Sequence, residues 1–151
     1  MTPHPYDAHE LPVSERASLA ALLTSAALPT DDIDMTAARF WRFRDTHGDV
    51  GFAGLEVCGG DALLRSIVVA PERRRQGHGR AILAWMLDQA ARLGVRRVFL
   101  LTTTAADFFA AAAFIRVSRD AAPASIRATS EFAKLCPETA VCMMKLLTPP
   151  A

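Results

Sequence analysis

Arginine and glycine residues gather in residues 73–80, whose sequence is RRRQGHGR. Gly77 and Gly79 flank His78, and an amphipathic helical pattern begins at Arg80, so the free N–H groups of a helix N-terminus should lie here. Glycine has no Cβ atom, which lets an anion come close to the main chain. Full positive charges surround the same point and are carried by Arg73, Arg74, Arg75 and Arg80. This segment therefore predicts a binding site for a phosphorylated cofactor.

The spacing within this segment excludes two common phosphate-binding motifs. A P-loop ends in Gly-Lys-Ser or Gly-Lys-Thr, which the segment lacks. The dinucleotide-binding motif needs a third glycine at the position that Ile82 occupies. The remaining pattern, Arg74-x-x-Gly77-x-Gly79 after a V-x-P sequence, resembles the acyl-CoA pyrophosphate loop of the GNAT superfamily of N-acetyltransferases.

The resemblance extends over roughly residues 40–147. A strand-like run, Ala62–Val69, precedes the loop, and a helical pattern and a second strand-like run follow it. The segment from Ala106 to Phe114 loosely matches the family pattern A-x-x-F-Y-x-x-x-G-F. The resemblance implies an α/β (α+β) domain whose central mixed, mostly antiparallel β-sheet is splayed at the acyl-CoA cleft and carries helices on both faces.

Hydrophobic periodicity and turn residues predict the elements that must position this loop. Helices are predicted over residues 14–27, 80–93 and 105–113, with short helical turns within 123–135. Strands are predicted over residues 40–45, 50–57, 62–69, 97–103, 115–119 and 141–147. Gly94 falls where a helix C-cap is expected, and Gly59-Gly60-Asp61 predicts a hairpin. We interpret residues 1–12 as a lead-in and residues 13–151 as a single N-acetyltransferase domain.

When the family's cofactor-binding positions are transferred residue by residue to this sequence, the resemblance implies a site for acetyl-CoA as co-substrate. In the family, the pantetheine arm pairs with main-chain groups of the strand before the loop. Main-chain N–H donation from Ile67 would polarise the thioester carbonyl, which makes Ile67 a catalytic residue as well. The implied cofactor contacts come from Ile67, Val68, Val69, Arg74, Arg75, Gln76, Gly77, His78, Gly79, Arg80 and Phe109.

The chain departs from the family at the group that protonates the leaving thiol. That group is commonly a tyrosine, whose position is occupied by Phe109, while the only tyrosine of the chain is Tyr6. The family's glycine near the end of this segment is Ala113, and its carboxylate on the fourth strand would fall near Leu63. Water together with the acidity of the thiol itself, or another side chain, would then have to serve.

Three threonines, Thr102, Thr103 and Thr104, end the predicted strand at the edge where the active sites of α/β folds usually lie. We take Thr103 as the catalytic candidate near the thiol. Capping of the helix that follows is an equally good explanation for Thr104.

Two charges interrupt the apolar strands on either arm of the predicted hairpin. Glu56 is the first candidate for the general base that deprotonates an acceptor amine, and the alternative is a carboxylate that is solvated or paired with Arg65. Because a buried unpaired arginine is costly, we expect Arg65 to pair either with a structural partner such as Glu56 or with a substrate carboxylate. Glu131 is a second candidate on the acceptor side, with the first turn of a helix capped by Ser130 as the alternative.

Three further segments indicate which branch of the family the sequence resembles. Residues 63–66, 101–105 and 131–143 are similar to the branch known as arsenic-resistance N-acetyltransferases, which lies close to amino-acid N-acetyltransferases of the N-acetylglutamate-synthase kind. Cys136 and Cys142 would be soft ligands for a trivalent arsenical if the fold brings them together; the alternative is that both pack as small apolar side chains. The four histidines lack metal-ligand spacing, and no metal site is predicted.

Composition narrows the classes of partner. A net charge of +1 over 151 residues implies no general attraction to nucleic acid or to a membrane. No apolar run reaches membrane-spanning length, and the first residues do not resemble a signal peptide. Three cysteines do not suggest a disulfide framework, so we expect a cytoplasmic protein. The sequence leaves a homodimer open.

These observations predict an acetyl-CoA-dependent N-acetyltransferase. It would act by direct transfer on a small primary amine, an amino acid or an amino-acid-like compound. The alternative, which the missing tyrosine keeps open, is a catalytically silent domain that binds or senses acyl-CoA.

Overall fold

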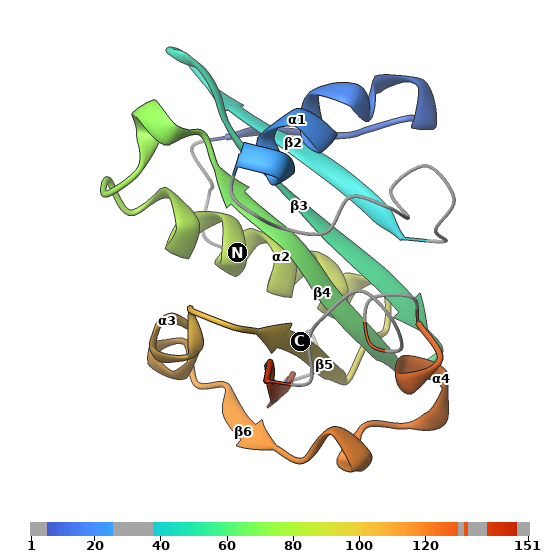
Figure 1. Ribbon diagram of the computed structural model, residues 1–151. Coiled ribbons are helices and arrows are strands. Elements are labelled where there is room, and N and C mark those ends of the chain that lie inside the picture. Colours follow the sequence, from blue (N-terminus) through green and yellow to red (C-terminus); the bar gives the residue numbers. More distant parts are fainter. Residues whose placement is uncertain (1–5, 26–37, 130–131, 133–138, 148–151) are drawn as a thin grey trace.

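The computed structural model describes residues 6–25, 38–129, 132 and 139–147. Within them, a seven-stranded sheet has the strand order β1-β2-β3-β4-β5-β7-β6. The strands are β1 (Asp7–Glu10), β2 (Arg39–Asp45), β3 (Gly48–Cys58), β4 (Asp61–Val69), β5 (Arg97–Thr102), β6 (Ile115–Val117) and β7 (Val141–Leu146). The helices are α1 (Ala17–Ser25), α2 (His78–Arg92), α3 (Ala106–Ala111) and α4 (Ala124–Arg127), with single 3₁₀ turns η1 (Val13–Glu15), η2 (Pro71–Arg73) and η3 (Arg119–Ala121) (Figure 1).

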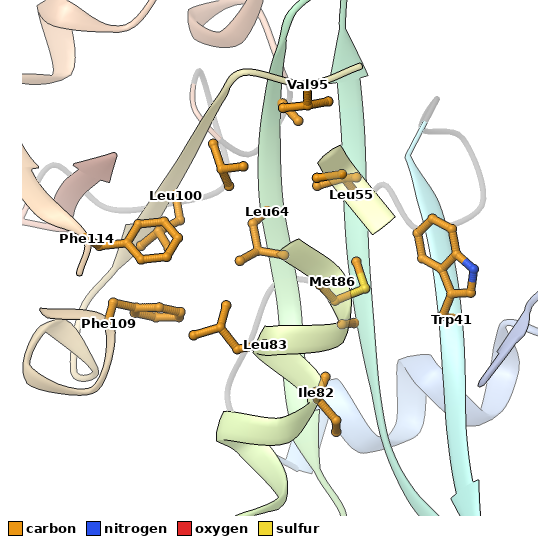
Figure 2. Close-up of a cluster of buried hydrophobic side chains, with 14 of the residues drawn as sticks. Trp41, Leu55, Leu64, Ile82, Leu83, Met86, Val95, Leu100, Phe109 and Phe114 are labelled. Carbon is orange, nitrogen blue, oxygen red and sulfur yellow. The ribbon is translucent and has the colours of Figure 1, made fainter. Parts of the chain in front are cut away.

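Helices lie on both faces of this mixed sheet. On one face, α2 and the Phe109 ring of α3 pack on strand residues such as Leu64 and Leu100 (Figure 2). On the other face, α1 packs on Phe40 and its neighbours, and α4 covers a separate cluster further along the sheet. All strand pairs are antiparallel except β4 with β5. The predicted fold class is therefore confirmed.

The parallel pair β4–β5 is joined only at its beginning. Its register runs from Asp61↔Arg97 to Leu63↔Phe99. Beyond this point the two strands diverge, β4 toward the start of α2 and β5 toward α3 (Figure 1). The joined end is held firmly: Arg97 Nε and Nη2 donate to the two carboxylate oxygens of Asp61 at 2.7 and 3.1 Å. The sheet is thus splayed as the sequence resemblance implied.

A β-bulge distorts β4 beside the point where the strands part. The β3–β4 register shifts between Phe52 and Gly54, because Phe52 pairs with Val68 whereas Gly54 pairs with Arg65. Within the bulge, Ser66 has a φ of 61°. Such a bulge re-aims the residues that follow it.

The beginning of the chain contributes a strand that sequence patterning did not predict. Residues 7–10, within the predicted lead-in, form β1 and pair with β2 from Asp7↔Arg44 to Glu10↔Trp41. The strand is mostly exposed and polar, so it lacks the alternating pattern by which a half-buried strand is recognised. Other boundaries differ modestly: α2 begins at His78 instead of Arg80, and β6 ends at Val117 instead of Arg119.

Some predicted segments lie outside the described residues, including the end of the first predicted helix and most of residues 130–138. Among the helices that are described, none combines the length and the apolar character needed to cross a membrane.

Two helices end in the same hydrogen-bonded motif with different residues at its left-handed position. After α2, Gly94 has a φ of 84°, and Val95 N–H donates to Ala90 O at 3.0 Å. After α3, Ala113 has a φ of 71°, and Phe114 N–H donates to Phe109 O at 3.1 Å. Both are Schellman C-caps, in which glycine is preferred because a Cβ atom is strained at positive φ.

The Ala113→Gly variant should therefore be more stable than the wild-type protein. Relief of the left-handed strain contributes about 1 kcal/mol, which corresponds to a rise of roughly 2–4 °C in the melting temperature of a domain of this size. Thermal unfolding followed by circular dichroism measures it. An unchanged or lowered melting temperature would contradict this account of the α3 cap.

Candidate active site

The loop between β4 and α2 exposes an uncapped helix N-terminus. After Val69, the η2 turn redirects the chain, and Arg74 Nε donates to the Val69 carbonyl at 3.1 Å. Gly77 is the N-cap of α2 and has a φ of 83°, a conformation that glycine adopts without strain. No side chain caps the first N–H groups of α2. These groups and the helix dipole favour an anion at this point.

The loop is fixed from outside by contacts with β1 and with the β2–β3 turn. Arg73 donates to the Asp45 carboxylate and, at 3.3 Å, to the Asp49 carbonyl. The hydrogen bond from Arg73 lowers the pKa of Asp45 below its usual value. Since Asp45 compensates its charge, Arg73 serves the structure of the loop and is not one of the charges available to an anion.

Tyr6 makes the second of these contacts. Its hydroxyl and His78 Nδ1 are hydrogen-bonded at 2.6 Å, and its ring lies edge-on against Phe43 with 5.9 Å between centroids. Burial, with a further contribution from the negative charge of Asp45, raises the pKa of Tyr6. The only tyrosine of the chain therefore lies beside the start of α2.

The predicted cofactor residues of the loop lie together around the start of α2. Arg74, Arg75, Gln76, Gly77 and Arg80 are exposed, and His78 and Gly79 are half-buried. Between α2 and α3 the surface is hollowed by about 290 Å³, lined by Arg80, Leu83, Phe108, Ala111 and Ala112. One guanidinium thus borders a largely apolar hollow.

Phe108, which the sequence analysis did not select, lies at the meeting point of β4, α2 and α3. A Cβ atom added to Gly79 would lie 3.4 Å from Phe108 Cε1 and 3.9 Å from Val69 Cγ2. Phe108 is 37% exposed. The predicted contact Phe109 is buried instead, packed against Phe114 with 5.6 Å between ring centroids. Neighbouring helix positions point about 100° apart, so the Phe-Phe pair alone did not show which ring borders the hollow.

The bulge gives β4 main-chain groups that neither neighbouring strand pairs in register. The β3–β4 register and the β4–β5 register both omit Ser66 and Ile67. Ile67 and Val69 pack toward the α2 face, whereas Val68 is buried on the α1 face. The predicted cofactor strand thus keeps its apolar side chains in the core while its main chain borders the space where β4 and β5 part.

The two charged acceptor candidates share the α1 face of the sheet. Glu56 pairs with Leu63, and Arg65 pairs with Gly54, so the two charged residues occupy diagonal positions across β3 and β4. Arg65 is 3% exposed, and its guanidinium lies 5.7 Å from the Phe40 ring centroid. The third candidate, Glu131, lies outside the described residues.

The threonine that stabilises the start of α3 is not the one that the sequence analysis considered. Thr102 Oγ1 accepts a hydrogen bond from Ala105 N–H at 3.0 Å, so Thr102, not Thr104, stabilises the turn into α3. Ala105 is the N-cap of α3 and makes no side-chain hydrogen bond. Thr103 and Thr104 are exposed.

Of the two cysteines proposed as soft ligands, Cys136 lies outside the described residues. Cys142 is buried, and burial raises its pKa to about 11. Such a thiol is protonated at neutral pH, whereas the thiolate is the form that binds metals. The proposed pair stays a prediction.

Comparison with known proteins identifies the family. A family model described as acetyltransferase (GNAT) domain matches residues 36–116, more than half of the 151 residues. The chain therefore belongs to the GNAT family of acetyltransferases. A search of curated proteins gives no match.

Solved structures share the fold at low sequence identity. N-acetylglutamate synthase from Neisseria gonorrhoeae, complexed with coenzyme A and N-acetyl-glutamate, has a TM-score of 0.77 at 19% identity, with 97% of this chain and 36% of that chain covered. This chain thus spans about a third of the synthase. Rv2747 from Mycobacterium tuberculosis, in complex with CoA, has a TM-score of 0.73 at 20% identity over 94% and 99% of the two chains. The ribosomal-protein-S18-alanine N-acetyltransferase from Escherichia coli has a TM-score of 0.72 at 18% identity over 97% and 96%.

The residues of this chain fit acetyl-CoA, the co-substrate that the sequence resemblance implies. The uncapped helix N-terminus that Gly77 opens would suit its pyrophosphate, and main-chain groups at the splay, such as those of Ile67, would suit its arm. The exposed guanidinium groups of Arg74, Arg75 and Arg80 suit its phosphates.

Gly79→Val should weaken CoA binding at least about tenfold, because one charge-assisted hydrogen bond contributes about 1.5–3 kcal/mol. The φ of Gly79 is not in the left-handed region, so the substitution tests space for the ligand more than backbone strain. Isothermal titration with CoA measures the effect.

Gly60→Val is the matched control, since a Cβ atom at Gly60 meets nothing within 4 Å and the residue lies in the distant β3–β4 turn. Equal CoA affinities for folded Gly79→Val and for the control would refute the assignment of the pyrophosphate site.

Proposed function

We propose that this protein transfers the acetyl group of acetyl-CoA directly to a small primary amine, an amino acid or an amino-acid-like compound. The observation that carries the proposal is the bulge at Ser66 and Ile67, where main chain outside both ladders borders the parting of β4 and β5. An uncapped helix start, which favours an anion, follows the far end of the same strand.

Acetyl-CoA supplies an activated acyl group, and the chain supplies its orientation. The α2 N-terminus binds the pyrophosphate, with Arg74, Arg75, Gln76, His78 and Arg80 around it. The main chain of Ile67, Val68 and Val69 aligns the arm. The Ile67 N–H donates to the thioester oxygen, where a fixed donor is worth a few kcal/mol as negative charge develops.

The acceptor lies on the α1 face of the sheet, where Glu56 and Arg65 stand. Glu56 accepts a proton from the amine, which frees the nitrogen lone pair to attack the carbonyl carbon. Arg65 attracts the acceptor's carboxylate. A zwitterionic acceptor complements this pair of charges. The solved relatives named for N-acetyl-glutamate and for a ribosomal-protein alanine support an amino-acid-like acceptor.

As the C–S bond breaks, the departing sulfur takes a proton from water, and water accepts the second proton of the acceptor nitrogen. Thr103 is the side chain proposed near the sulfur. Phe109 cannot donate a proton, and its ring belongs to the core. This feature also supports a second candidate function, a domain that binds acyl-CoA without turnover.

Finer assignments remain proposals. The arsenic-resistance branch rests on residues 63–66, 101–105 and 131–143, and part of the last segment, with Glu131, lies outside the described residues. Cytoplasmic localisation and a homodimer are likewise proposals that rest on sequence alone.

Release of CoA from acetyl-CoA, measured over a panel of amino acids, their analogues and arylamines, separates the two functions. At least one amine should accelerate the release in the wild-type protein. Glu56→Gln should lower the maximal rate by roughly a hundredfold, the usual scale for a lost general base.

Glu15→Gln, an exposed carboxylate outside the site, is the matched control and should keep the wild-type rate. CoA binding without turnover on any amine would favour the silent domain. A Glu56→Gln variant with wild-type kinetics would remove Glu56 from the mechanism.

If Phe109 occupies the position of the family's tyrosine, as the sequence resemblance implies, Phe109→Tyr should leave turnover intact or raise it, because the new hydroxyl would then lie near the departing sulfur. The buried ring makes folding the necessary control, measured by thermal unfolding. A severe loss of turnover in a variant of unchanged stability would show that the ring faces a dry pocket away from the sulfur.

A further inference from the structure

Ser66 adopts a backbone conformation that a serine rarely takes. Among the described residues, only Ser66, Arg75 and Ala113 combine a positive φ with a side chain beyond hydrogen. A left-handed conformation in the middle of a strand is disfavoured for every residue with a Cβ atom. Residues held in this way persist only where their surroundings fix them.

The contact that fixes Ser66 comes from its neighbour. Arg65 Nε donates to Ser66 Oγ at 3.2 Å. Arg65 is itself immobilised: it is 3% exposed, and its guanidinium lies 5.7 Å from the Phe40 ring centroid. The Arg65 stem lies so close to Gly54 that a Cβ atom there would come within 3.3 Å of Arg65 Cγ. A buried, packed donor therefore holds the hydroxyl of the strained residue.

The position of this pair is distinctive. Regular alternation along β4 would put the side chains of residues 65 and 66 on opposite faces. The bulge suspends the alternation, and both side chains meet. Ser66 and Ile67 are the residues that neither the β3 nor the β5 register includes. The strain thus lies immediately before the main-chain group that the proposed function assigns to the thioester carbonyl.

We propose that Ser66 is a positioning residue for acetyl transfer, because the hydrogen bond from Arg65 Nε holds its left-handed backbone and so aims the Ile67 N–H at the acyl carbonyl. The inference rests on the proposed function. Arg65 then has two roles. Besides attracting the acceptor's carboxylate, it holds Ser66 through Nε and through the packing of its aliphatic stem, and this second role does not require a bound acceptor.

A serine held by a side-chain bond differs from a glycine at the same position. Glycine would adopt the conformation without strain, but it would also leave it freely. With serine, the hydrogen bond from Arg65 favours the left-handed conformation, which restricts the direction of the next N–H group. Such preorganisation helps catalysis because no reorientation is needed as charge develops.

Two substitutions separate the hydroxyl from the backbone. Ser66→Ala removes the hydroxyl and keeps the strain, whereas Ser66→Gly removes both. The maximal rate of acetyl transfer should fall at least tenfold in Ser66→Ala and about threefold in Ser66→Gly. The affinity for CoA, which has no acyl carbonyl, should stay within twofold of wild type in both.

A binding measurement tests the inference without an acceptor. Calorimetry with acetyl-CoA and with CoA gives the affinity ratio that reports the carbonyl contact. The ratio should fall toward one in both variants. Ala113→Gly, a left-handed position outside the site, is the control and should keep the wild-type ratio and rate.

The results distinguish three cases. Wild-type rates and ratios in both Ser66 variants would overturn the inference and leave the proposed function standing. Parallel losses of CoA affinity and rate would also overturn it, since they indicate a purely structural role. If Ser66→Ala does not fold, Ser66→Gly decides alone. Wild-type protein that binds neither CoA nor acetyl-CoA would overturn the proposed function and this inference together.

Discussion

The architecture depends on the early end of the pairing between β4 and β5. Three register pairs join the strands, and the bidentate ion pair of Asp61 with Arg97 secures the joined end. Beyond Leu63 the main chain of β4 faces away from any ladder on that side, and main-chain groups in a protein interior require partners. The sheet stays intact because β3 pairs with β4 along its other edge and because α2 packs on β3 and β4.

The loop proposed to bind phosphate depends on a second set of contacts, which involve the beginning of the chain. β1 extends the sheet at its edge and brings Tyr6 to His78, while Asp45 at the end of β2 pairs with Arg73. The positive charge available in the loop is smaller than its four arginines suggest, because the carboxylate of Asp45 compensates the charge of Arg73. An edge strand with little buried surface of its own thereby contributes to the rigidity of the loop.

The sequence predicted the elements whose patterns are local. The apolar run before Pro71, the amphipathic period of α2 and the cap at Gly94 all occur within a few residues, and the structure confirms them. It could not predict features decided by distant contacts. β1 has no buried face, the bulge at Ser66 arises from register against β3, and the choice between Phe108 and Phe109 depends on how α3 is rotated over the sheet. For the candidate site, the shared face of Glu56 and Arg65 follows from their places on the hairpin arms only once the register is known.

The three described residues other than glycine that have a positive φ differ in what holds their strained backbone. Ala113 completes a helix cap whose two hydrogen bonds and Phe109–Phe114 contact offset its cost, and a glycine would serve the same geometry better. Arg75 lies in the exposed loop before α2 with a positive φ, and the proposed contact with CoA requires a charge that glycine lacks. Ser66 differs from both, because no helix cap or turn requires its conformation and a buried arginine donates a hydrogen bond to its hydroxyl. Strain that local structure does not require, held by a residue that is itself fixed, is most simply explained by what the strained segment must present to a ligand.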